Sequence, residues 1–89
     1  MQFMATITWE PGKRDEMIKR AQTLGVTPPE GVKVLGEWID VHGGRVFRLA
    51  EVEDPKSMFV SNLGWSDLCK IEATPVLPLE QAMSLIPAK

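Results

Sequence analysis

The chain is short, balanced in composition and mildly acidic. Its 89 residues suffice for one folded domain but not for two, each with its own core. Hydrophobic residues make up 44% and charged residues 25%, which excludes wholesale disorder. The formal net charge of -2 argues against a nucleic-acid partner, since nucleic-acid binders normally carry a basic excess. We therefore expect a single domain spanning residues 1–89.

Cysteine usage and the first residues bear on the compartment. Cys69 is the only cysteine, whereas small secreted domains are usually held by disulfides. Residues 1–4 lack the basic segment that opens a signal peptide. No apolar run approaches the roughly 20 residues that a membrane span needs. These features predict a cytoplasmic protein without a membrane partner.

The first half of the chain predicts a strand and then a helix. Residues 2–9 alternate between apolar and polar side chains, as in a half-buried strand, and Pro11-Gly12 ends the pattern. Residues 13–24 place an apolar stripe at helical spacing, made up of Met17, Ile18, Ala21 and Leu24. Gly25 suits a left-handed C-cap, and residues 27–31 predict a stiff loop.

A hairpin and a second helix follow. Residues 32–40 and 45–52 predict two strands, joined by residues 41–44, in which Gly43-Gly44 supplies positive φ. Asp54-Pro55 is typical of a helix start, with Asp as N-cap and Pro in the first turn. We expect this helix to end near Gly64, with residues 65–68 as a further short turn, and to turn three apolar side chains inward, namely Met58, Phe59 and Leu63.

The last third completes the fold. Residues 69–77 predict a fourth strand, and Pro75 favours a position at the edge of the sheet because proline lacks a backbone donor. Residues 79–86 predict a short C-terminal helix. The order βαββαβ followed by a helix predicts an α+β ferredoxin-like domain, with a four-stranded antiparallel sheet and two helices on one face.

The strands are apolar on both sides, which bears on assembly. In residues 32–40 simple alternation puts Val32, Val34 and Trp38 on one face and Leu35 and Ile39 on the other. Two helices cover only one face of such a sheet, so a second copy of the chain is the expected cover for the other. Two sheets packed face to face would form a homodimeric α/β barrel. The alternative is a monomer whose free face is partly apolar.

A set of short motifs is spread over nearly the whole chain, namely Pro11-Gly12, Pro29-Glu30-Gly31, residues 37–40, Gly44-Arg45, Phe47, Leu49, Glu51, Asp54-Pro55, residues 65–68, Glu72 and Pro75-Val76. In these motifs the chain resembles an uncharacterised bacterial and archaeal family of the dimeric α/β-barrel superfamily. This resemblance implies the ferredoxin-like fold and the dimer, and it brings no assigned activity. Relatives in the superfamily include cofactor-independent monooxygenases, haem enzymes, isomerases and amino-acid-sensing domains.

Charged residues within apolar strands are candidates for a site. Arg48, Glu51 and Glu72, together with Glu37, fall inside predicted strands, where charge is costly unless it is paired or hydrated. One hypothesis is a polar cluster that lines a cavity, with Arg48 binding an anionic group and Glu51 or Glu72 acting as a base or hydrogen-bond acceptor. The alternative is a set of structural ion pairs or positions at a rim.

Two tryptophans and an aspartate complete the candidate pocket. Trp38 and Trp65 are either anchors of the core or interface or walls for a planar ligand. Asp67 could cap the turn that follows the second helix or reach the pocket. His42, the only histidine, falls in the hairpin loop and is expected to be solvated, and Cys69 is expected to be a buried structural thiol. One His and one Cys do not make a zinc site, and we expect neither a metal nor a cofactor.

These residues lead to two hypotheses about function. The first is binding of a small planar or anionic organic ligand in a pocket between sheet and helices, where any catalysis would resemble cofactor-independent oxygenase or isomerase chemistry. The second is a non-catalytic structural or regulatory homodimer. An enclosed cavity that contacts Trp38 or Trp65 and at least one of Arg48, Glu51 or Glu72 would favour the first.

Overall fold

The protein folds around one antiparallel sheet. The computed structural model describes residues 1–24 and 30–87. Its four strands are β1 (Gln2–Thr8), β2 (Val32–Ile39), β3 (Arg45–Val52) and β4 (Lys70–Val76). They pair in the order β2-β3-β1-β4, and every pairing is antiparallel. The predicted C-cap at Gly25 and most of the predicted loop at 27–31 lie outside the described residues.

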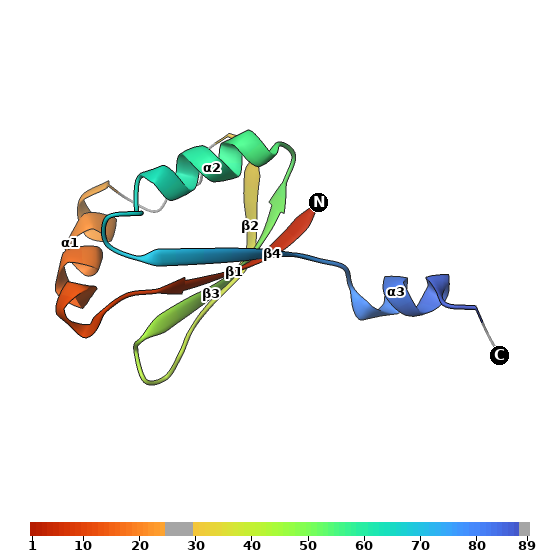
Figure 1. The fold of residues 1–89 in the computed structure, drawn as a ribbon, viewed down its shortest axis with the longest axis horizontal. Coiled ribbons are helices and arrows are strands. Elements are labelled where there is room, and N and C mark those ends of the chain that lie inside the picture. The colour runs from red at the N-terminus through yellow and green to blue at the C-terminus, as the bar shows by residue number, and fades with distance from the viewer. Residues whose placement is uncertain (25–29, 88–89) are drawn as a thin grey trace.

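Two helices cover one face of the sheet and a third stands apart. A 3₁₀ turn, η1 (Pro11–Lys13), leads into α1 (Arg14–Leu24), and α2 (Pro55–Leu63) connects β3 to β4. Both α1 and α2 lie on the same side of the sheet, whereas α3 (Leu79–Leu85) extends away from the end of β4 (Figure 1). The fold is therefore the predicted ferredoxin-like α+β arrangement with a C-terminal helix. No helix of the described ranges is both long and apolar enough to cross a membrane.

Local chemistry explains where several elements begin and end. The Asp54 carboxylate accepts a hydrogen bond of 2.9 Å from the backbone N–H of Lys56, and Pro55 occupies the first turn of α2, as predicted. Pro75 lies in β4, an edge strand, as its missing donor requires. In the β2–β3 hairpin only Gly43 adopts a positive φ, at 79°, so the expectation that both glycines of the loop need it was wrong for Gly44.

A bulge in β2 overturns the predicted distribution of its side chains. The pairing with β3 shifts between Val34 and Gly36, so Leu35 has no partner across the ladder. Beyond this point the alternation is reversed, and Ile39 lies on the helix-covered face with Val34, whereas Trp38 lies on the open face. The prediction that Trp38 shares a face with Val34 was therefore wrong. Glycine inside a strand often marks a bulge, so Gly36 was the available signal.

The orientation of α2 also differs from the prediction. Met58 faces the sheet, but Phe59 is 65% exposed and Leu63 is 57% exposed, so their predicted inward positions were wrong. The inward face instead carries residues at helical spacing, namely Met58, Ser61, Asn62 and, just past the helix, Trp65. The prediction assigned the apolar residues of α2 to its inward side, whereas two inward positions are occupied by the polar residues Ser61 and Asn62.

The described core is small. The buried hydrophobic residues of the described ranges are Ile7, Ala50, Val52 and Leu68, and none of them is completely excluded from solvent. Neither α1 nor α2 packs extensively on the sheet, and their main contact with it is between α2 and β3. The space between the helices and the sheet is consequently not filled by side chains.

The hairpin that joins β2 and β3 is held by Asp40. Its carboxylate accepts the backbone N–H of His42 at 3.0 Å and the Nε–H of Arg45 at 3.0 Å, and it also contacts His42 Nδ1 at 3.1 Å. The backbone bond from His42, followed by the bond from Arg45, lowers the pKa of Asp40 from 3.8 to about 2. Because the folded-state pKa is the lower one, this carboxylate stabilises the hairpin fully above about pH 4, and the contribution is lost as the pH falls toward 2.

We therefore expect a carboxyl-carbon NMR titration to give a pKa near 2 for Asp40. His42→Ala keeps the backbone donor, so it should leave this pKa low and change stability by no more than about 0.5 kcal/mol. A titration midpoint near 4 would show that the hydrogen bonds of the hairpin do not form in solution.

Candidate functional site

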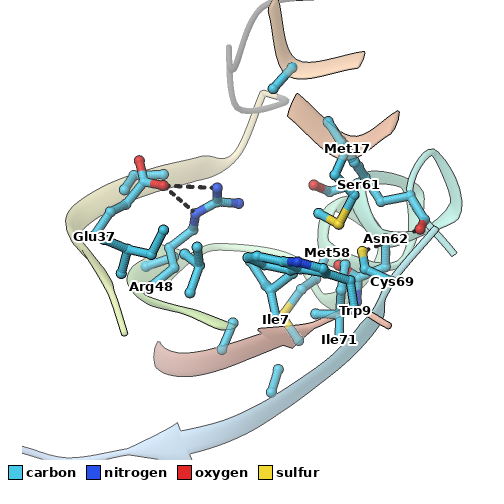
Figure 2. Close-up of a pocket in the computed structure, with 18 of the residues that line it drawn as sticks. Ile7, Trp9, Met17, Glu37, Arg48, Met58, Ser61, Asn62, Cys69 and Ile71 are labelled. Atoms are coloured by element: carbon cyan, nitrogen blue, oxygen red, sulfur yellow. Dashed lines mark hydrogen bonds and ion pairs between the residues drawn. The ribbon is translucent and has the colours of Figure 1, made fainter. Parts of the chain in front are cut away.

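A cavity of about 580 Å³ lies between the sheet and the two helices. Its volume falls within the range of about 300–1,000 Å³ that is typical of small-molecule sites. One wall is the helix-covered face of all four strands, and the other is formed by the inward stripes of α1 and α2 (Figure 2). The lining is predominantly apolar and includes Phe3, Ile7, Val34 and Ile71.

Small side chains on the sheet make room for this cavity. One register row crosses all four strands, in the order Glu37, Arg48, Ala5 and Ala73. Two of these four positions are alanines on adjacent strands, and all four line the cavity. A larger residue at Ala5 or Ala73 would occupy the space that is now open. The cavity is thus the direct result of this register row and of the way the helices stand off the sheet.

The other half of the same row is an ion pair at one side of the cavity. Arg48 donates from Nε at 3.2 Å and from Nη2 at 2.9 Å to one carboxylate oxygen of Glu37 (Figure 2). The Arg48 side chain is 27% exposed and that of Glu37 is 44% exposed, so the pair is partly hydrated. Arg48 Nη1 donates no hydrogen bond to the described residues, so this end of the guanidinium group can donate to a ligand. The pair is neutral overall and offers both a donor and an acceptor.

Neutral polar groups and sulfur atoms lie across the cavity from this pair. Ser61 and Asn62 project from α2, with Met17, Met58 and Cys69 close by (Figure 2). The Cys69 thiol donates to the carbonyl oxygen of Trp65 at 3.3 Å, and burial raises the pKa of this thiol. The thiolate is therefore disfavoured. Cys69 is only half-buried and lines the cavity, so the prediction of a buried thiol was wrong.

Trp65 and Asp67 belong to a bridge that ties α1 to the turn after α2. The Arg20 guanidinium on α1 donates to both carboxylate oxygens of Asp67, at 2.7 and 2.8 Å, and to the carbonyl oxygen of Gly64 at 3.0 Å. It also lies 5.8 Å from the centroid of the Trp65 ring, in cation–π range. The hydrogen bonds to Arg20 lower the pKa of Asp67, and those to Asp67 raise the pKa of Arg20. Asp67 thus fixes the helix that roofs the cavity without lining the cavity itself.

The structure separates the six predicted site residues into three groups. Arg48 and Trp65 line the same cavity, and Asp67 lies outside it in the bridge to Arg20. The other three occupy the open face of the sheet, namely Trp38, Glu51 and Glu72. The cavity contacts both Trp65 and Arg48, but it is partly open to solvent, so it meets the expected contacts and not the expected enclosure.

Two residues of the open-face group, Glu72 and Trp38, have a local explanation. Glu72 is paired with Lys70 on the same face at 2.8 Å, which lowers the pKa of Glu72 and raises that of Lys70. Trp38 is 55% exposed and lies over Gly36, where a Cβ would come within 2.6 Å of the indole ring. Gly36 thus permits the indole to lie flat on the strand.

Sequence reasoning missed several residues of the lining. Trp9 lines the cavity together with Ile7 (Figure 2). The alternation of residues 2–9 puts these two residues on the same face of the strand, so Trp9 could have been predicted as a lining residue from the sequence. Ser61 and Asn62 gave no signal of their own, because they are ordinary residues for an exposed helical face.

The wall provided by Trp65 can be tested by substitution. We expect Trp65→Phe to cost no more than about 1–2 kcal/mol of stability, because the ring borders open space on one side. Affinity for a cavity ligand should fall about fivefold, since part of the aromatic wall is removed. Melting temperature and dissociation constant measured on the same variant check both values. Trp38→Phe, on the opposite face, is the matched control and should leave the affinity unchanged.

The chain was also compared with known proteins. It matches, over residues 1–89, the family described as a domain of unknown function, DUF3303. No curated protein and no solved structure gives a significant match. Since the match extends over the whole sequence, the chain belongs to the DUF3303 family, whose function is unknown.

Proposed function

We propose that this protein binds a small organic ligand with a flat apolar body and a polar or anionic end. The observation that carries the proposal is the cavity of about 580 Å³ between sheet and helices. Water in a space lined mainly by apolar side chains is readily displaced by apolar surface. The aromatic rings of Trp9 and Trp65 supply flat walls, which favours a planar ligand.

The polar groups of the cavity define how such a ligand would be oriented. The Nη1 end of Arg48 can donate to a carboxylate, sulfonate or carbonyl oxygen of the ligand. Glu37 balances the charge of Arg48, so the site accepts a neutral polar end as well as an anionic one. Ser61 and Asn62, on the far side, can donate to or accept from a second polar group.

The geometry favours binding over catalysis. On the described lining the carboxylate of Glu37 is held by Arg48, and the raised pKa of Cys69 keeps that thiol protonated. His42 has an 89% exposed side chain in the hairpin loop and does not line the cavity. Oxygenase- or isomerase-like chemistry would therefore have to come from the ligand itself.

A pair of fluorescent naphthalene probes tests this function. N-phenylnaphthylamine is neutral, and anilinonaphthalene sulfonate adds an anionic group to the same ring system. We expect both to bind with one site per chain and to gain fluorescence. Each should raise the melting temperature by an amount that grows with the logarithm of its concentration above the dissociation constant. Absence of saturable binding by either probe, with the protein folded, would contradict the proposal.

We further propose that the working unit is a homodimer that buries the open face of the sheet. This face carries Trp38 and Leu35, which are 55% and 43% exposed, next to the half-buried rings and side chains of Phe47, Leu49 and Met4. Such a patch is unusual on a monomer. Light scattering at micromolar concentration should give about twice the chain mass of 9.9 kDa. A cytoplasmic location is part of the same proposal and is supported by the free thiol of Cys69.

A further inference from the structure

We infer that α3 is an arm that docks on a second copy of the chain and thereby holds the dimer together. This inference rests on the homodimer proposed above and adds a contact that the sheet-to-sheet interface does not include. It concerns residues 77–86, which take no part in the cavity.

The arm lacks partners within its own chain. It leaves the end of β4 and extends away from the sheet and from both covering helices (Figure 1). Among the described residues, α3 shares no extensive contact with any other element. A helix of 7 residues is far below the roughly 12–15 residues at which isolated helices become stable in water, so α3 needs a packing partner.

The sequence of α3 presents one apolar side to such a partner. Residues at helical spacing share this side, namely Leu79, Ala82, Met83 and Ile86. Three of them are large and exposed, with exposed fractions of 75% for Leu79, 58% for Met83 and 61% for Ile86. The other side carries the polar residues Glu80, Gln81 and Ser84, together with Leu85, which is 76% exposed and lies beside Gln81. The arm is thus amphipathic, with its apolar side unburied.

The shape of the chain indicates how much surface a partner has to cover. The Cα radius of gyration is 15.1 Å, whereas a compact chain of this length has about 12 Å. The accessible surface is 6927 Å², roughly 1,700 Å² more than the value for a compact monomer of this mass. A stable interface buries only about 800 Å² on each partner. The surplus is therefore large enough for an intertwined dimer that uses both the open face and the arm.

Charge and backbone geometry favour a second copy over a membrane. Membrane-surface helices are typically rich in Lys and Arg, whereas α3 contains Glu80 and no basic residue. Pro78, at the start of the arm, has a restricted φ, here -52°, which limits its return toward its own sheet. Both copies carry the same arm and the same open face. In a two-fold symmetric dimer, each arm can therefore contact the other copy while the two open faces pack together.

Charged substitutions on the two sides of α3 test the inference in the full chain. Leu79→Glu with Met83→Glu puts two charges on the apolar side, and Gln81→Glu with Ser84→Glu puts the same two charges on the polar side. We expect light scattering to show a dimer for wild type and for the polar-side variant. The dimer of the apolar-side variant should be at least tenfold weaker. Circular dichroism checks that the sheet of each variant is folded.

A second measurement locates the arm directly. In a dimer mixed from carbon-13-labelled and nitrogen-15-labelled chains, isotope-filtered NMR should give contacts between the Leu79 and Met83 methyl groups of one chain and amides of the other. An unchanged dimer in the apolar-side variant, without such contacts, would overturn the arm and leave the open-face dimer standing. A monomeric wild type would overturn the dimer and the arm together. So would a monomer that binds anionic phosphatidylglycerol vesicles through α3.

Discussion

Ala73→Phe is expected to abolish binding of N-phenylnaphthylamine without unfolding the protein. Ala73 lies on the sheet wall of the cavity, opposite Ala5 in the register of β1 and β4. A phenyl ring at this position would occupy the space of the probe, so the affinity should fall more than tenfold. The free energy of unfolding should stay the same or rise by about 0.5–2 kcal/mol, since filling a cavity commonly stabilises a fold.

Gln22→Phe provides the control for this variant, because it adds the same ring to the exposed side of α1. Its probe affinity should match that of wild type. Tight probe binding by Ala73→Phe, in a folded protein, would mean that the probe binds elsewhere and that the cavity is not the site.

The ion pair at the side of the cavity should control the preference for anionic ligands. Glu37→Gln removes the carboxylate that neutralises Arg48, so the affinity for anilinonaphthalene sulfonate should rise about fivefold. Arg48→Gln leaves Glu37 as the only charge of the pair, and the affinity should fall about fivefold. We expect modest factors because both side chains are partly exposed, and solvent screens their charges.

The neutral probe is the internal control for this pair of variants. The affinity for N-phenylnaphthylamine should change less than twofold in both, because it lacks the sulfonate. Equal losses for the two probes would show that the substitutions disturb the cavity wall and that Arg48 does not recognise the anionic group.

The elements that follow from local chemistry could be predicted from the sequence. The alternation of residues 2–9 gave the position of β1, and Asp54-Pro55 gave the start of α2 within one residue. Pro75 placed β4 at an edge because a missing backbone donor has the same consequence in any sheet. These are properties of single residues and of short periodic patterns, and they do not depend on distant parts of the chain.

The face of the sheet or helix on which each side chain lies could not be predicted in the same way. The bulge at Leu35 reverses every later side chain of β2, and only the glycine that follows hinted at it. The outward position of Phe59 depends on how α2 is rotated over a cavity that its own sequence does not reveal. The sequence also did not show that Arg48 and Trp65 line the same cavity, or that Glu51 and Glu72 point away from it, because this depends on how the strands and α2 are arranged in space.

The three tryptophans allow the central claim, that the cavity binds a small planar ligand, to be tested in one experiment. Trp9 and Trp65 line the cavity, and Trp38 lies on the opposite face of the sheet. In a proton–nitrogen NMR titration with N-phenylnaphthylamine, the indole signals of Trp9 and Trp65 should shift together and saturate at one probe per chain, while that of Trp38 stays in place. A shift confined to Trp38, or no saturable shift of Trp9 and Trp65, would contradict the account.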